Sequence, residues 1–319
     1  MARTKADVLS KARKIALGSN NRKGIVPTTL VYIVLLCLGF TYILPLLQMI
    51  VTVFMTPQDL VDPKVIWVPT SIYFDGVKTA FTALRYGEGL FVTAALCVVP
   101  AFLQTICTAL AGYAFGRFEF PLKKFWLLMV IAFYVVPIQI TLIPRYMMFM
   151  QYKIIETPWA AYLPALFGQG LKSGIFILIF YQFFSSYPKS LDEAAEIDGC
   201  GRFKVFYRIA LPMSGPAMVI SVIFSVVWYW NETAQPQLYY ARAKNTKLFG
   251  IDVLNLQSLP YRVITFVDRY KEEFSAQTGP ANATVMAAGL LAILPILILY
   301  FVLQKRFVES VERSGITGE

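Results

Sequence analysis

The chain has 319 residues, of which 57% are hydrophobic and only 15% charged, and its formal net charge is +10 at pH 7. A mean hydropathy of +0.59 is too high for a soluble domain of this length and indicates an integral membrane protein. The sequence has no histidine, which excludes a histidine-based nucleophile, proton shuttle or metal site. No basic stripe is interleaved with stacking aromatic residues, which argues against nucleic-acid binding.

Six apolar segments have the composition expected of membrane-spanning helices, each of which needs about 20 mostly apolar residues. In chain order they are residues 30–54, 90–115, 125–144, 163–184, 217–230 and 284–303. Glycines and Lys172 interrupt the fourth segment, and the fifth is short. The first apolar run is too long for the core of a signal peptide, so we expect it to be retained as a helix. The prediction is an all-α membrane protein with six transmembrane helices.

Lysine and arginine are concentrated in the N-terminal tail and in the segments that follow the second, fourth and sixth spans. Short loops rich in these residues stay in the cytoplasm, whereas a loop as long as residues 233–280 has little influence on orientation. Both termini are therefore expected to be cytoplasmic. The expected organisation is a basic tail at residues 1–27, a transmembrane domain at residues 28–308 and a second cytoplasmic tail at residues 309–319.

The chain shows no energy-coupling site of its own. Lys172 is the one lysine, arginine, aspartate or glutamate within the six apolar segments, which argues against a proton-coupled or ion-coupled carrier. The nearest approach to a P-loop, at residues 168–173, has the wrong spacing to cradle phosphate. We therefore expect no catalytic residue, metal or cofactor in this chain, and we expect the driving force to enter from elsewhere.

Residues 190–212, SLDEAAEIDGCGRFKVFYRIALP, form an unusually polar stretch between the fourth and fifth spans. Ser190 and Glu193 have the spacing of a capping box, which predicts a helix that starts directly after Ser190. The acidic residues that follow fall in its first turn, where the helix dipole favours negative charge. Gly199 stands where a left-handed C-terminal cap is needed, and Pro212 is expected to end a second helix.

On the residues alone, this stretch is either a well-formed connecting loop or a docking surface for another chain. Leu191, Ala194 and Ala195 share one helical face, and the two alanines permit close approach of another backbone. A connection needs only about 5 residues. Two helices with an apolar face exceed that need, which favours a partner in the cytoplasm.

The stretch also resembles the EAA loop of permease subunits of binding-protein-dependent ATP-binding-cassette (ABC) importers. The residues that carry the resemblance, at matching spacings, are Glu193, Ala194, Ala195, Gly199, Ile209, Leu211 and Pro212. Further segments resemble the carbohydrate branch of that family, and within it the smaller permease of maltose-type importers: AGYAFGRFEFPLKK (111–124), VPIQITLIPRYMM (136–148), WYWNE (228–232) and LPILILYFVLQKRFVES (294–310).

The resemblance implies a type I ABC importer permease fold in which the loop at residues 186–215 couples the spans to a cytoplasmic ATPase. By position, Glu193 would contact the ATPase, the two alanines would allow close approach, and Gly199 would form the corner between two helices. Asp198 precedes that glycine and belongs to the same motif.

The implied partners are a second, homologous permease subunit, two copies of an ABC ATPase subunit, an extracytoplasmic solute-binding protein and membrane lipid. ATP and Mg would be bound by the ATPase subunit. The implied location is the cytoplasmic membrane of a bacterium, and the implied function is uptake of a carbohydrate such as an oligosaccharide.

Candidates for the substrate pathway are four residues at the outer end of the fifth span: Tyr229, Trp230, Asn231 and Glu232. Aromatic faces beside hydrogen-bonding groups suit sugars, but aromatic belts also occur at any membrane interface. The loop at residues 233–280 is expected to fold, either to contact the solute-binding protein or as an insertion with no role in cargo selection.

Two alternative functions remain beside carbohydrate uptake. An importer permease for a non-sugar solute, such as a polyamine or a phosphate ester, would differ only in its cargo. A self-contained channel or secondary carrier would work without partners and would place charged residues within its spans, which the nearly uncharged spans disfavour.

Overall fold

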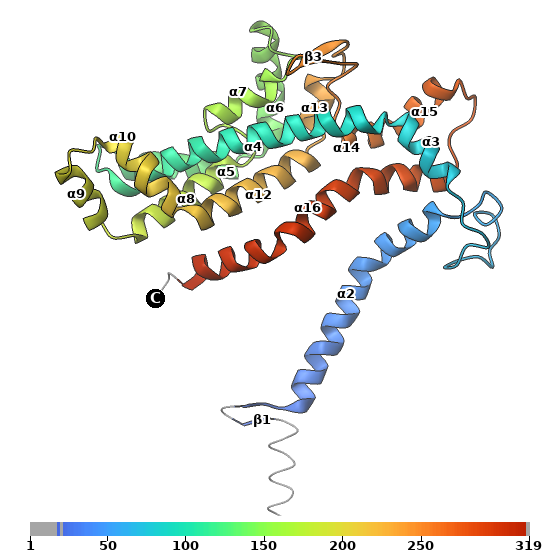
Figure 1. Ribbon diagram of the computed structural model, residues 1–319, viewed down its shortest axis with the longest axis horizontal. Helices are drawn as coiled ribbons and strands as arrows, with labels where there is room; N and C mark the ends of the chain where they lie inside the picture. The colour runs from blue at the N-terminus through green and yellow to red at the C-terminus, as the bar shows by residue number, and fades with distance from the viewer. Residues whose placement is uncertain (1–17, 20–21, 317–319) are drawn as a thin grey trace, which may run out of the picture. The chain divides into compact units, whose positions relative to one another are not determined.

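The computed structural model describes residues 18–19 and 22–316, and these residues are mostly helical (Figure 1). The predicted tail at residues 1–27 lies mostly outside these ranges, as does the very end of the tail at residues 309–319. The chain divides into two units, one formed by residues up to 77 with residues 281–287, and one formed by residues 78–280 with residues from 288 onward. We call them the N-terminal unit and the main unit.

The N-terminal unit begins with a hairpin of β1 (Gly18–Ser19) and β2 (Arg22–Lys23), followed by the long helix α2 (Ile25–Val53) and the start of α3 (Asp75–Ala83). Within the described residues, no residue in the most apolar part of α2 is buried. A helix that is apolar on all sides and exposed in its own chain requires lipid or another subunit around it. This helix matches the first predicted span.

The loop between α2 and α3 is fixed by the carboxylate of Asp59. This carboxylate accepts a hydrogen bond from the Thr70 hydroxyl at 2.6 Å, and further bonds from the backbone N–H groups of Thr56 and Thr70 at 3.1 and 3.3 Å. The bond from the Thr70 hydroxyl lowers the pKa of Asp59 more than any other contact, because it favours the charged form. The loop is therefore ordered by its own side chains.

The core of the main unit is built around α4 (Tyr86–Arg117), against which α8 (Ser173–Ser186) and α12 (Gly215–Asn231) pack (Figure 1). Thr105 of α4 and Ser221 of α12 meet at 3.1 Å between their hydroxyl oxygens. A polar contact between buried helix faces is a common way to fix neighbouring membrane helices. The helix α4 matches the second predicted span.

The third predicted span is wrong as a continuous helix. The structure has α5 (Lys123–Val135) and α6 (Ile138–Gln151) in its place, bent by 95° relative to each other. Pro137 lies in the break and has no backbone N–H to continue the helix, and it forces the preceding residue, Val136, into an extended conformation (φ −62°, ψ 123°). Pro137 therefore divides the segment that was predicted as one span.

The fourth predicted span is also divided, into α7 (Trp159–Leu166) and α8, with a loop at residues 167–172 between them. The sixth span corresponds to α16 (Asn282–Ile316). Within the described residues, three helices are long and apolar enough to cross a membrane alone, and five spans result if each of two bent helix pairs is counted as one. Six spans therefore stay a prediction.

The segment at residues 233–280 is folded, as predicted. It contains α13 (Ala234–Tyr239), a hairpin of β3 (Thr246–Leu248) and β4 (Ile251–Val253), and the helices α14 (Leu259–Ile264) and α15 (Phe266–Phe274). Its apolar side chains join residues from the first turns of α4 in one core; among them are Val92, Leu96, Tyr239, Tyr240, Leu248, Val253 and Leu256. We call this segment the outer subdomain, after the side of the membrane on which the sequence predicts it.

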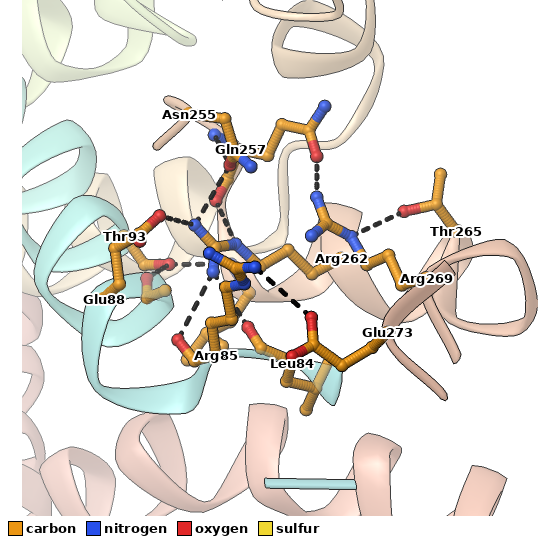
Figure 2. A network of polar contacts seen from close by, with 12 residues as sticks. Leu84, Arg85, Glu88, Thr93, Asn255, Gln257, Arg262, Thr265, Arg269 and Glu273 are labelled. Atoms are coloured by element: carbon orange, nitrogen blue, oxygen red, sulfur yellow. Dashed lines mark hydrogen bonds and ion pairs between the residues drawn. The ribbon is translucent and has the colours of Figure 1, made fainter. Parts of the chain in front are cut away.

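A buried guanidinium group ties the outer subdomain to the start of α4 (Figure 2). The side chain of Arg262 has no exposed surface, and it donates to the carbonyl oxygen of Leu84 and to the carboxylate of Glu88, both at 2.8 Å. It also donates to the side-chain oxygen of Asn255 at 3.0 Å and to the carbonyl oxygen of Gln257 at 2.9 Å. Burial lowers the pKa of Arg262, and the ion pair with Glu88 opposes that effect.

Candidate functional sites

Two short helical segments project beyond the packed helices at one end of the main unit (Figure 1). The first is α9 (Ser190–Ile197), and the second runs through α10 (Arg202–Val205), the π-helix η1 (Phe206–Ala210) and α11 (Leu211–Met213). The predicted pair of helices is confirmed. We call residues 186–215 the projecting segment.

The corner of the projecting segment is a glycine in the left-handed conformation, as predicted. Gly199 has φ +77°, its N–H donates to the carbonyl oxygen of Glu196 at 3.0 Å, and the N–H of Cys200 donates to that of Ala195 at 2.9 Å. This pair of bonds is a Schellman motif, which satisfies two carbonyl groups at the end of α9. A Cβ atom at Gly199 would meet nothing within 4 Å, so the backbone angle alone favours glycine here.

The predicted capping box at the start of α9 is wrong. The helix includes Ser190, its N-cap residue is Lys189, and the N–H of Glu193 donates to the backbone carbonyl of Lys189 at 3.1 Å with no side-chain cap. Lys189 already has helical backbone angles, so the Ser190 side chain lies inside the first turn. The acidic first turn is confirmed, because Asp192 and Glu193 both lie in it.

Arg117, at the end of α4, fixes the start of α9 in place of a side-chain cap. The side chain of Arg117, only 3% exposed, forms an ion pair with Asp192 at 2.7 Å, and it donates to the carbonyl oxygens of Tyr187 and Pro188 at 3.1 and 3.0 Å. Its guanidinium carbon lies 3.8 Å from the centroid of the Tyr187 ring, and the Tyr187 hydroxyl donates to Asp192 at 2.7 Å. One side chain therefore joins α4, the end of α8 and α9.

The two sides of the projecting segment differ in burial. Ala195 packs into the main unit, whereas Leu191, Ala194 and Glu193 are exposed, so the predicted apolar face of Leu191, Ala194 and Ala195 is split between two sides. Five large apolar side chains of the two helices are exposed: Leu191, Ile197, Phe203, Tyr207 and Met213. Such a set on two short helices is the composition of an interaction surface.

The remaining residues of the motif anchor the second helix. Leu211 is half-buried and packs on an aromatic core that includes Tyr113 and Phe206. Ile209, two residues earlier, is also half-buried. The helix ends at Met213, one residue after Pro212, and the chain then bends by 78° into α12. The π-helical turn η1 ends at Ala210, two residues before Pro212, and the N–H of Leu211 bonds to the carbonyl oxygen of Phe206. Asp198 is exposed at the C-cap of α9.

A second candidate site is a cavity of about 1080 Å³ within the main unit. Segments from α5, α6, the loop at residues 168–172, α8 and α12 contribute to its wall. The polar members of the wall are Thr141, Arg145, Gln169, Lys172, Ser173, Asn231 and Glu232, and the aromatic members include Phe115, Phe125, Trp126, Phe133, Tyr134 and Trp228. Its size and mixed lining are those of a small-molecule site.

The structure separates the four residues predicted for the substrate pathway. Asn231 and Glu232 line the cavity, but Tyr229 and Trp230 are buried behind its wall and do not line it. The Trp230 ring donates its N–H to the carbonyl oxygen of Ala292 at 3.2 Å. These two aromatic side chains therefore pack within the chain in this structure, and their place in a substrate pathway stays a prediction.

Tyr229 nevertheless shapes the cavity, because it fixes the loop in front of it. Its hydroxyl donates to the side-chain oxygen of Gln104 at 2.9 Å and accepts from the N–H of Leu171 at 3.2 Å, while the Gln104 amide donates to the carbonyl oxygen of Leu171 at 2.7 Å. A Cβ atom at Gly170 would clash with the side-chain oxygen of Gln104 and with the Tyr229 hydroxyl, so a larger residue there would have to displace these groups. Sequence reasoning missed Gln104, which is a single amide within a long apolar run.

Replacing Tyr229 by phenylalanine should lower the thermal stability of the purified protein. The change leaves the Leu171 N–H and one bond of Gln104 unsatisfied in a buried position, which costs about 1–3 kcal/mol. Tyr239→Phe is the matched control, because the Tyr239 hydroxyl is buried and bonds to no described residue. Thermal unfolding in detergent should therefore show a lower midpoint for Tyr229→Phe only, and equal midpoints would contradict the proposed role of the hydroxyl.

Several known proteins are similar to this chain. The probable starch degradation products transport system permease protein AmyC of Thermoanaerobacterium thermosulfurigenes is 26% identical over 282 residues, covering 88% of this chain and 93% of the relative. The arabinooligosaccharides transport system permease protein AraQ of Halalkalibacterium halodurans is 24% identical over 296 residues, covering 89% and 96%.

One solved structure supports the fold. A bacterial ABC transporter involved in the import of the acidic polysaccharide alginate contains a chain that matches with a TM-score of 0.65 and 16% identity, covering 88% of this chain and 96% of that chain. The family described as binding-protein-dependent transport system inner membrane component matches residues 108–313, which include the projecting segment and the cavity wall. The chain therefore belongs to the family of inner membrane components of binding-protein-dependent transport systems.

Proposed function

We propose that this chain is a permease subunit of an ATP-driven ABC importer that takes up a carbohydrate, in particular an oligosaccharide delivered by an extracytoplasmic solute-binding protein. Membership of the family supports the transport role, and the relatives named for starch degradation products and arabinooligosaccharides support the cargo class. The cavity adds aromatic faces beside hydrogen-bonding side chains, which suit a saccharide.

The proposal rests mainly on the projecting segment. We assign this segment as the surface that docks into a separate ATPase subunit. It exposes large apolar side chains on two short helices, yet the described part of the chain offers nothing to cover them. In this assignment Glu193 contacts the ATPase, exposed Ala194 permits close approach, and Gly199 with Asp198 shapes the corner. ATP and Mg are bound by the ATPase, so the chain itself catalyses nothing.

The proposed assembly contains a second, homologous permease, two ATPase subunits and membrane lipid. Six spans with both termini in the cytoplasm place the projecting segment on the ATPase side of the bacterial cytoplasmic membrane, as the distribution of lysine and arginine predicts. Closure of the ATPase pair on ATP would move the projecting segment, and the segment would switch the spans between inward and outward access.

Co-purification tests the docking role. The tagged chain, extracted gently from its native membrane, should bring with it an ABC ATPase and a second multi-span permease. Gly199→Val should reduce recovery of the ATPase severalfold, because a β-branched residue does not fit φ +77°. Gly201→Val is the matched control, since Gly201 has an extended backbone (φ −66°, ψ 151°) that valine adopts easily and open space around it. An intact, monodisperse chain recovered alone would overturn the proposal.

A further inference from the structure

The charges on the cavity wall are unbalanced. The wall contains two cationic side chains, Arg145 and Lys172, and one carboxylate, that of Glu232. This carboxylate already accepts the backbone N–H groups of Ala234 and Gln235, at 2.8 and 3.0 Å, where it caps α13. Among the described residues of the wall, two cations therefore stand against one carboxylate, which already has one oxygen, Oε1, bonded at the start of a helix.

Neither cation has an anionic partner among the described residues. Arg145 is half-buried on α6 and forms no hydrogen bond or ion pair with any residue that the structure describes. The ammonium group of Lys172 lies 4.6 Å from the centroid of the Trp228 ring. A cation held against an aromatic ring keeps all its hydrogen-bond donors available for an incoming group.

The backbone around Lys172 is held in an uncommon conformation. Lys172 has φ 54°, in the left-handed region that few non-glycine residues occupy. The preceding residue, Leu171, is clamped through both its N–H and its carbonyl oxygen by Tyr229 and Gln104. Strained residues that the surroundings hold in place cluster at binding sites, so the clamp presents Lys172 at a fixed point of the cavity wall.

Aromatic surfaces accompany the two cations. Trp126, Phe133 and Tyr134 line the same cavity and remain substantially exposed, and Trp228 provides the ring beneath Lys172. Sugar rings stack on such faces, but stacking leaves the cations uncompensated. An unpaired cation in a membrane protein is costly and marks a path for a charged ligand. A saccharide that carries carboxylates would satisfy both features.

We propose that the cargo of this importer is an anionic saccharide, whose carboxylate groups pair with Arg145 and Lys172 while its sugar rings stack on the aromatic wall. This inference rests on the proposed transport function and specifies its substrate class. A guanidinium fork and an ammonium group both form charge-assisted bonds with carboxylates. A neutral saccharide of the same length would gain only the stacking.

Uptake by the assembled importer in proteoliposomes tests the inference. The probes are trimers of galacturonic, mannuronic and glucuronic acid, and the neutral trimers with the same linkages. With ATP inside and the solute-binding protein outside, at least one uronate trimer should accumulate faster than its neutral counterpart. ATP-driven uptake of neutral trimers without uptake of any uronate would overturn the inference and leave the transport function intact. Absence of ATP-driven uptake of every trimer would contradict the transport function itself.

Variants of the cavity wall test whether the cavity itself, and not only the solute-binding protein, selects the cargo. Arg145→Gln and Lys172→Gln should each lower uronate uptake about tenfold, the equivalent of one charge-assisted contact of about 1.4 kcal/mol. Arg145→Lys keeps the charge and should restore most of the uptake. Lys153→Gln is the matched control, because Lys153 is an exposed cation near α6 that does not line the cavity. Wild-type uptake in the Arg145→Gln, Lys172→Gln double variant would assign these cations to another role, such as lipid phosphate, and would overturn the inference.

Discussion

Arg117→Ala should lower ATP-driven uptake at least tenfold while leaving the membrane-embedded part of the chain folded. The side chain joins the end of α4 to Asp192 in the first turn of α9 and to two carbonyl groups at the end of α8. Removing it leaves a largely buried carboxylate without its cation, a loss on the order of 3–5 kcal/mol. The first helix of the projecting segment would then lose its polar connection to α4, and only the apolar contacts of Phe206 and Leu211 with the core around Tyr113 would remain, so uptake should fall by at least tenfold.

The measurement is uptake together with ATP hydrolysis by the assembled importer. Arg117→Lys should give an intermediate result, because a single ammonium group cannot reproduce the contacts of the guanidinium fork. Arg202→Ala is the matched control within the same segment: its ion pair with Glu196 is long, at 3.8 Å, and both side chains are more than half exposed. Normal uptake by Arg117→Ala, or an equal loss in Arg202→Ala, would contradict the assigned role of Arg117.

The projecting segment shows which parts of the site local sequence signals could predict. Gly199 was identifiable because a left-handed residue at the end of a helix is nearly always glycine. The capping box was wrong because Arg117, 75 residues away in sequence from Asp192, takes over the task of fixing the start of α9. A contact of that range leaves no spacing pattern in the sequence. Before the structure, Arg117 was simply one more cation at the end of an apolar segment.

The membrane helices also show which features sequence composition can predict and which it cannot. Composition identified the long helices α2, α4 and α16, since a long run of apolar residues is sufficient evidence for them. It did not reveal that the third predicted span breaks by 95° at Pro137, because proline is also tolerated within continuous membrane helices. The cavity depended on that break, since residues from both α5 and α6 line it. In the sequence, nothing indicated that the two cations of the cavity wall, Arg145 and Lys172, lie in one site.

Replacing Arg262 by alanine should destabilise the protein more than any other single change in the outer subdomain. Its guanidinium group makes bonds to Leu84, Glu88, Asn255 and Gln257, and the side chain is completely buried (Figure 2). Breaking a buried ion pair by removing one partner costs about 3–5 kcal/mol, because the remaining charge and carbonyl groups stay buried without partners. The midpoint of thermal unfolding in detergent should therefore fall sharply.

Arg242→Ala is the control for Arg262→Ala, since Arg242 is an exposed cation of the same subdomain with no ion pair to a described residue. A double-mutant cycle with Glu88→Gln measures the contribution of the Arg262–Glu88 ion pair to the free energy of unfolding. If the ion pair dominates, the double variant Arg262→Ala, Glu88→Gln should recover part of the loss, because the uncompensated carboxylate is gone. If it recovers none, the bonds to the Leu84 and Gln257 carbonyl groups carry the stability, and the guanidinium group acts chiefly as a backbone clamp. A midpoint unchanged in Arg262→Ala would contradict both accounts and would show that the outer subdomain is held to α4 by its apolar core alone.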